Sequence, residues 1–136
     1  MNEQNIVKQK LVTCIVCPNG CEVTVKELND GEIVAEGYEC KRGLKYSLDE
    51  FKDPKRILAT TVRIRDARIP LVPVRTREGV PKNMLNDILD VLARIEVKAP
   101  IICGDVVLEN ILDTGVDVIA TRSLGIDECN KIACTL

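Results

Sequence analysis

The stretch Cys14-Ile15-Val16-Cys17-Pro18-Asn19-Gly20-Cys21 decides how this chain is organised, together with Cys40-Lys41-Arg42-Gly43 further along. The two segments form a C-x2-C-x3-C...C array. Thiolates at such spacings must reach one small inorganic body from different directions, so the chain has to wrap around it. Pro18 fixes φ and Asn19-Gly20 tolerates positive φ, which lets the loop turn sharply between the second and third cysteines. The array predicts a metal or redox centre.

Three kinds of centre compete for these cysteines. A structural zinc site with four cysteines usually has two separated knuckles of similar spacing. Here three cysteines share one loop and the fourth stands alone, which is the usual arrangement for a [4Fe-4S] cubane. Redox-active or disulfide-bonded cysteines are the third possibility. We therefore expect Cys14, Cys17, Cys21 and Cys40 to ligate a [4Fe-4S] cluster, with zinc as the alternative.

Composition excludes several classes of function. Among 136 residues, 19 Lys and Arg face 21 Asp and Glu, the net charge is -2, and only two Tyr and one Phe are aromatic. A nucleic-acid binder would need a basic surface and usually stacking rings. The chain has no histidine, which rules out Ser-His-Asp and Cys-His catalysis, Cys2His2 zinc sites and Rieske centres.

Seven cysteines also bear on the cellular compartment. A secreted disulfide scaffold would normally be shorter and begin with a signal peptide. The first ten residues, MNEQNIVKQK, are polar, and no apolar stretch is long enough to span a membrane. We expect a reduced, cytoplasmic protein, in which clustered cysteines more often bind metal or do redox chemistry.

The fold class expected is α+β. Residues 1–52 should form a small cysteine-rich β module. Its expected elements are two strands, a hairpin turn into a third strand, and one or two helical turns at Lys10–Thr13, Glu22–Glu27, Glu32–Ala35 and Leu44–Phe51.

Residues 53–136 should form a mixed β/α domain with one main amphipathic helix. Arg56–Arg65 and Ile69–Thr76 are rich in β-branched residues, and Pro70 and Pro73 in the second of them favour an edge strand. Glu78-Gly79-Val80-Pro81 should open the helix, with Pro81 at an early helical position and an apolar face for the core. Short apolar runs predict strands at Ala99–Cys103, Asp105–Leu108 and Val116–Thr121.

Several other residues have competing interpretations. Lys41, Arg42 and Lys45 either offset the charge of a cluster, with Arg42 beside it, or form a solvated turn. Tyr46 is expected in the core, and Cys103 should be buried as a small apolar residue. No role is assigned to Cys129 and Cys134. Four carboxylates are expected to cover the outer face of strands rather than to do acid/base or metal chemistry: Asp105, Glu109, Asp113 and Asp117.

The first 65 residues or so resemble the N-terminal iron–sulfur segment of molybdopterin oxidoreductases such as formate dehydrogenases. The resemblance is carried by Cys14, Cys17, Gly20-Cys21, Cys40 and the basic-Gly pair Arg42-Gly43. In that family the pattern binds [4Fe-4S]. Here the gap before the fourth cysteine is shorter, and Arg42 replaces the lysine that lies between cluster and pterin. A chain of this length also lacks the large domains that bury a molybdopterin, so it is not expected to be that enzyme.

Nearly the whole chain resembles a family of small, uncharacterised bacterial and archaeal proteins. The shared segments are CxxCxxGC, CKRGxxY, the Thr-Thr-Val-Arg strand, PVRT followed by VPK, and GDVVLENILDTGVDVIATR. Such proteins are usually encoded beside a flavin-dependent glycerol-3-phosphate dehydrogenase and an FAD- or NAD-linked oxidoreductase. The resemblance thus implies an accessory electron-transfer subunit with these two partners and without turnover of its own. The alternative is a zinc-stabilised interaction module without redox activity.

Overall fold

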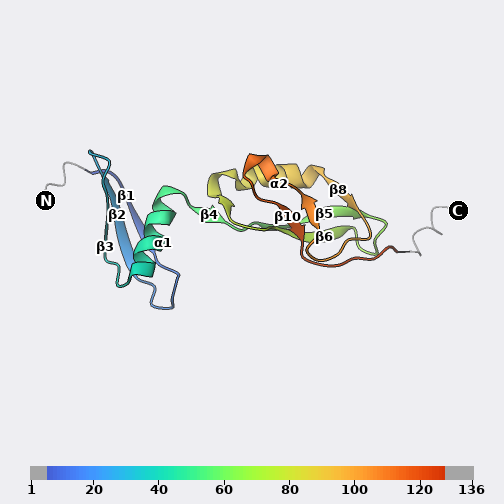
Figure 1. The fold of residues 1–136 in the computed structure, drawn as a ribbon, viewed down its shortest axis with the longest axis horizontal. Helices are drawn as coiled ribbons and strands as arrows, with labels where there is room; N and C mark the ends of the chain where they lie inside the picture. Colours follow the sequence, from blue (N-terminus) through green and yellow to red (C-terminus); the bar gives the residue numbers. More distant parts are fainter. Residues whose placement is uncertain (1–5, 128–136) are drawn as a thin grey trace. The chain divides into compact units, whose positions relative to one another are not determined.

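The computed structural model describes residues 6–127 and divides the chain into two compact units, Met1–Pro54 and Lys55–Leu136. Strands and helices occur in both units, which confirms the α+β class (Figure 1). No helix among the described residues is both long enough and apolar enough to cross a membrane.

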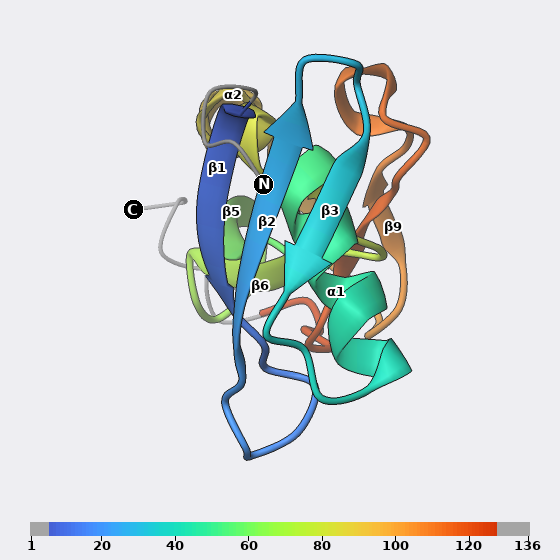
Figure 2. The same ribbon diagram turned by 90° about the vertical axis from the view of Figure 1, so that its left-hand side faces the viewer.

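The first unit is an antiparallel three-stranded sheet with one helix packed on it. Its elements in chain order are β1 (Ile6–Thr13), β2 (Glu22–Leu28), β3 (Ile33–Glu36) and α1 (Lys41–Lys52). The strands lie in the order β1-β2-β3 (Figure 2). Strand β1 and helix α1 are longer than predicted from the sequence, because polar residues of β1 and the first turn of α1 carry no apolar periodicity.

A small core holds the first unit together. The alternation of the strands turns valines inward, and α1 presents Phe51 to them; the buried residues are Val12, Val23, Val25 and Phe51. Tyr46 packs against this core, as predicted, and the Lys8 ammonium lies 5.0 Å from the centre of the Phe51 ring. With so few buried side chains, each contributes a large share of the stability of the unit.

The second unit is built on a five-stranded sheet. Its strands lie in the order β8-β5-β6-β10-β9, at Glu96–Lys98, Ala59–Arg65, Leu71–Thr76, Val118–Ala120 and Val106–Leu108. All neighbours pair antiparallel except β5 and β8. Helix α2 (Leu85–Arg94) follows a 3-10 turn (Lys82–Met84) and packs on the sheet through Ile88 and Leu92. A two-stranded ribbon pairs β4 (Lys55–Arg56) with β7 (Val80–Pro81).

Three predictions for this unit were wrong. Pro81 ends strand β7 and does not lie in the first turn of the helix, because a 3-10 turn intervenes before α2 begins at Leu85. Strand β6 is central and not at an edge. Pro73 is tolerated in this strand because it lies opposite Thr121, just past the end of β10. The ladder therefore does not need the N–H that proline lacks. The Pro73 carbonyl still accepts a hydrogen bond from the Thr121 amide at 2.9 Å. The strand expected at Ala99–Cys103 is replaced by β8, which ends at Lys98, and only an isolated bridge remains at Ile101.

Candidate functional site

The cysteine array lies at one end of the first unit. Strand β1 ends at Thr13 and β2 begins at Glu22, so the residues between them form the loop that carries Cys14, Cys17 and Cys21. The ends of this loop are tied together, because the Cys14 amide donates to the Cys21 carbonyl at 2.8 Å. Figure 2 shows this loop and the connection from β3 to α1 at the same end of the sheet.

Cys40 joins the array through the start of α1. It is the N-cap residue of the helix, and its sulfur accepts a hydrogen bond from the Gly43 amide at 3.4 Å. The positive end of the helix dipole and this amide both favour a thiolate at the position. The fourth cysteine of the array is therefore also the N-cap of α1.

Gly43 is the point at which distant parts of the array meet. A Cβ built on Gly43 would lie 3.5 Å from the Cys14 sulfur and 3.8 Å from the Cys40 sulfur. The two sulfurs thus border one small space that is open because residue 43 has no side chain. Ser47, one turn along α1, is fully buried and donates its hydroxyl to the Gly43 carbonyl at 2.8 Å, which fixes this part of the helix.

Gly37 sets how the segment before α1 approaches the loop. Its φ of +91° lies in the region that favours glycine, and a Cβ there would come 2.5 Å from the Glu22 carbonyl oxygen. Only glycine lets the chain pass this close to the first residue of β2. The close passage brings Glu39 to Cys21 and Cys40 to Cys14.

The electrostatics of the four thiols differ. The Gly43 amide lowers the pKa of Cys40, and the Arg42 amide and guanidinium add to this effect. Partial burial raises the pKa of Cys21, and the neighbouring Glu39 carboxylate, which hydrogen-bonds to it, raises that pKa further. Cys17 and Cys14 also act on Cys21 through their charge, so these three thiols share one electrostatic environment. Cys40 is therefore better prepared than Cys21 to be a thiolate.

The cysteine-lined end of the first unit has donor atoms that suit an inorganic centre, but its side chains are not yet gathered around one point. Its donors are all sulfur, they come from a loop and a helix start, and Gly43 leaves a space beside two of them, which suits an iron–sulfur cluster or zinc. As placed, however, no three Cys, Asp or Glu side chains among residues 6–127 lie close enough to hold one metal ion. Binding would require the loop between Cys14 and Cys21, which carries Cys17, to rearrange so that further sulfurs reach the space beside Cys14 and Cys40.

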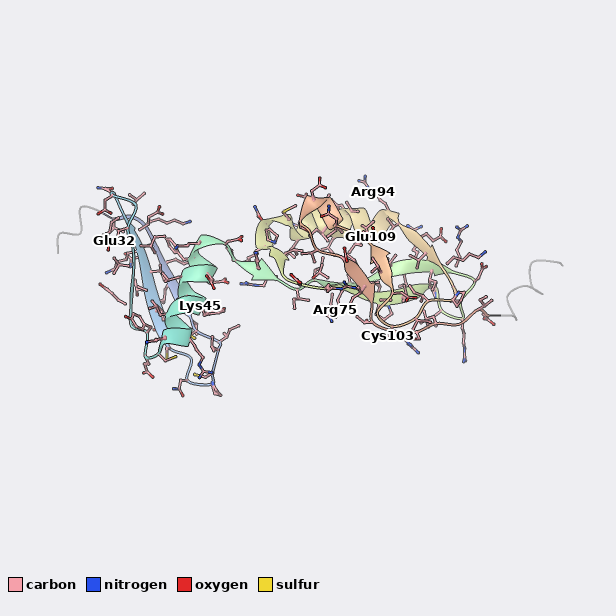
Figure 3. All side chains as sticks on the ribbon, in the orientation of Figure 1. Glu32, Lys45, Arg75, Arg94, Cys103 and Glu109 are labelled. Carbon is pink, nitrogen blue, oxygen red and sulfur yellow. The ribbon has the colours of Figure 1, made fainter. Side chains whose placement is uncertain are left out.

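The other residues singled out in the sequence have separate places. Lys41, Arg42 and Lys45 are exposed on the first two turns of α1, where Figure 3 labels Lys45. Glu39 was missed in the sequence, and its only available signal was an acidic residue directly before Cys40. Cys129 and Cys134 lie outside the described residues.

The prediction that Cys103 is buried was wrong. Ile101 is buried at an isolated bridge, and the chain then leaves the core, so that Ile102 and Cys103 are exposed where it turns. The turn is held by the Cys103 amide, which donates to the Ser123 hydroxyl at 2.8 Å.

The four carboxylates near the end of the chain belong to the second unit. Two of them organise loops: Asp105 accepts from the Ile102 amide, and Asp117 accepts from the Asn110 amide and pairs with Arg77 at 3.5 Å. Glu109 and Asp113 are exposed. No acid/base pair or metal-binding group is formed by them among the residues that the structure describes.

The fold and the cysteine-lined end thus define a small α+β protein with a candidate thiolate centre. The chain belongs to a family of proteins of unknown function, DUF1667, whose model matches residues 41–122. This match begins directly after Cys40 and ends within the second unit, so it includes Arg42, Gly43 and most of the second unit but none of the four cysteines.

One solved structure supports the fold. The NMR structure of Clostridium perfringens protein CPE0013 is 37% identical to this chain, with a TM-score of 0.51, over 54% of this chain and 88% of that one. No curated protein matches the chain significantly.

Proposed function

We propose that this protein is an iron–sulfur electron-transfer subunit that binds a [4Fe-4S] cluster through Cys14, Cys17, Cys21 and Cys40. The observation that carries the proposal is the space beside Gly43, which is bordered by the sulfurs of two cysteines far apart in the sequence. Nothing in the packing of the first unit requires a glycine in the first turn of α1. A centre placed between these sulfurs would require one.

The residues around the thiols supply what such a centre needs. The Gly43 amide and the Arg42 guanidinium stabilise negative charge at Cys40, and the cationic side chains of Lys41 and Lys45 lie on the same helix start. A bound cluster would supply one-electron transfer, taking single electrons from a partner's reduced flavin and passing them to an acceptor. Donors of hydrogen bonds to the sulfurs and nearby positive charge raise the potential of such a cluster.

The proposed partners follow from the resemblance of nearly the whole chain to small proteins that are usually encoded beside such enzymes. We propose a flavin-dependent dehydrogenase of the glycerol-3-phosphate type as electron donor, and an FAD- or NAD-linked oxidoreductase in the same assembly. The site would work in the cytoplasm, where thiols stay reduced. The chain would relay electrons and have no turnover of its own.

The experiment is a measurement of iron, sulfide and zinc, with a visible spectrum, on protein purified without oxygen. Near four irons and four sulfides per chain, and absorbance that bleaches with dithionite, is the expected result. Cys14→Ser and Cys40→Ser should deplete both, while Cys103→Ser, which changes an exposed cysteine of the second unit, should leave both unchanged. If the protein instead contains one zinc per chain, no iron and no dithionite-sensitive absorbance, electron transfer is refuted and the protein is a structural adaptor.

A further inference from the structure

The five-stranded sheet of the second unit has one face against the core and one face that residues 6–127 leave open. Paired residues of antiparallel neighbours share a face. Val62 pairs with Val72, and Val74 with Ala120, and all four are buried under α2. The residues that alternate with them point away from α2, and Figure 3 shows Arg75 on that side of the sheet.

Apolar side chains form the centre of this open face. Leu71 on β6 is 44% exposed and Val106 on β9 is 42% exposed. Between them lie the half-buried Pro73 and Ile119, since Ile119 pairs with Val106 on one side and with Arg75 on the other. The apolar residues therefore run across three strands and are not scattered singly.

Cationic side chains lie beside this centre, on β5, β6 and β8. The outward residues of β5, β6 and β8 include four cations and one acid, namely Arg63, Arg65, Arg75, Lys98 and Glu96. Two of the cations are paired, Arg65 with Glu96 at 3.1 Å and Lys98 with Asp66 at 3.7 Å. Arg63 and Arg75 have no acidic partner among residues 6–127. This face is thus positive in a chain whose net charge is -2.

We propose that this open face binds a partner protein whose contacting surface has acidic side chains around an apolar centre. Arginine and exposed apolar residues together are typical of protein interfaces, where the apolar part contributes burial and the charges select the partner. Two copies of the face would set arginines against arginines, which disfavours a second copy of this chain. A nucleic acid is disfavoured because the two Tyr and the one Phe all lie before residue 55. The proposal does not depend on the cysteine centre.

The test places a photo-cross-linking amino acid at Leu71 of the full chain in its native host. Leu89, exposed at 37% on α2, receives the same group as a control. We expect a cross-link from position 71 and not from position 89, to a peptide of another protein that contains Asp or Glu. That protein is then purified and its affinity for the full chain is measured.

Charge-reversal variants test whether the cross-linked partner binds this face through charge complementarity or touches it by chance. Arg63→Glu with Arg75→Glu should weaken binding by at least about tenfold, and replacing the cross-linked acidic residue of the partner with lysine should restore it. The control is Lys82→Glu with Arg94→Glu, an equal charge change at two exposed positions outside the sheet, which should have little effect. The milder Arg63→Gln with Arg75→Gln should give an intermediate loss, which keeps the test valid if the double reversal folds poorly.

Four results would overturn the proposal. They are no cross-link from position 71 above that from position 89, a cross-link only within the chain or to a second copy of it, a cross-linked peptide without acidic residues, or equal affinities for the Arg63/Arg75 and Lys82/Arg94 variants.

Discussion

Gly43→Ala should raise the stability of the metal-free protein and abolish metal loading. The added Cβ would lie 3.5 Å from the Cys14 sulfur and 3.8 Å from the Cys40 sulfur, which are ordinary van der Waals contacts. Gly43 lies in the first turn of α1 and its φ is not in the positive range. Replacing a helical glycine by alanine contributes up to about 1 kcal/mol by restricting the unfolded chain. The methyl group therefore fits the empty protein.

The same methyl group fills the space that the sulfurs of Cys14 and Cys40 border. A cluster or an ion bound by both sulfurs would need that space, and moving the helix to make room would disturb the packing of α1, whose Ser47 and Phe51 are buried. The substitution should therefore stabilise the metal-free protein and prevent metal binding. Only a ligand-binding role of the space predicts this combination.

Stability can be followed in the first unit alone, because Tyr38 and Tyr46, the two tyrosines of the chain, both belong to it. Urea unfolding followed by tyrosine fluorescence in the presence of a chelator gives the stability of the empty state. Anaerobic reconstitution with iron and sulfide, and separately a zinc titration, give the loading. Gly125→Ala is the matched control, since a Cβ there meets open space. Wild-type loading by Gly43→Ala would refute the assignment of the space to a ligand, and a less stable empty protein would refute the packing argument.

Three further results are expected from the first unit. In metal-free protein near pH 8, iodoacetamide should modify Cys40 faster than Cys21, because the Gly43 amide lowers the pKa of Cys40 while burial raises that of Cys21. Mass spectrometry of partly modified protein checks the order of modification, and equal rates would contradict the prediction. Gly37→Ala should destabilise the unit by at least about 1–3 kcal/mol in tyrosine-monitored unfolding, since its Cβ would meet the Glu22 carbonyl at 2.5 Å; unchanged stability would show that the close passage is not needed. Phe51→Ala should cost about 3–5 kcal/mol and unfold the first unit while amide signals of residues 55–127 persist in NMR spectra, whereas loss of both sets would mean that the units do not fold separately.

The alternation of apolar residues predicted most of the elements, because burial on one face leaves a periodic trace in the sequence. Val23 and Val25 are buried on β2, and Ile88 and Leu92 face the core from α2, as their spacing indicates. Features that depend on a neighbouring strand left no such trace. Pro73 favoured an edge strand, yet its tolerance in a central strand is decided by where β10 ends.

The candidate site was only partly accessible to the same reasoning. Spacing indicated that four thiols share one centre, but it does not say which of them are already neighbours. That depends on the passage of Gly37 beside Glu22 and on the missing side chain of Gly43, which are contacts between segments distant in the sequence. Cys103 shows the reverse error, since a cysteine that follows two isoleucines reads as apolar core and lies exposed on a turn.

The site thus combines three cysteines beside regular elements with one in the middle of a loop. Cys14 directly follows β1, Cys21 directly precedes β2 and Cys40 caps α1, so each lies next to a regular element whose backbone hydrogen bonds fix its position. Cys17 lies in a stretch without regular structure, whose movement breaks no strand or helix. A centre that assembles on such an arrangement would first engage the Cys14–Cys40 side, where the pKa of one thiol is already lowered. It would then draw in the loop, because thiolates converge on the metal from several directions only when the chain wraps around it.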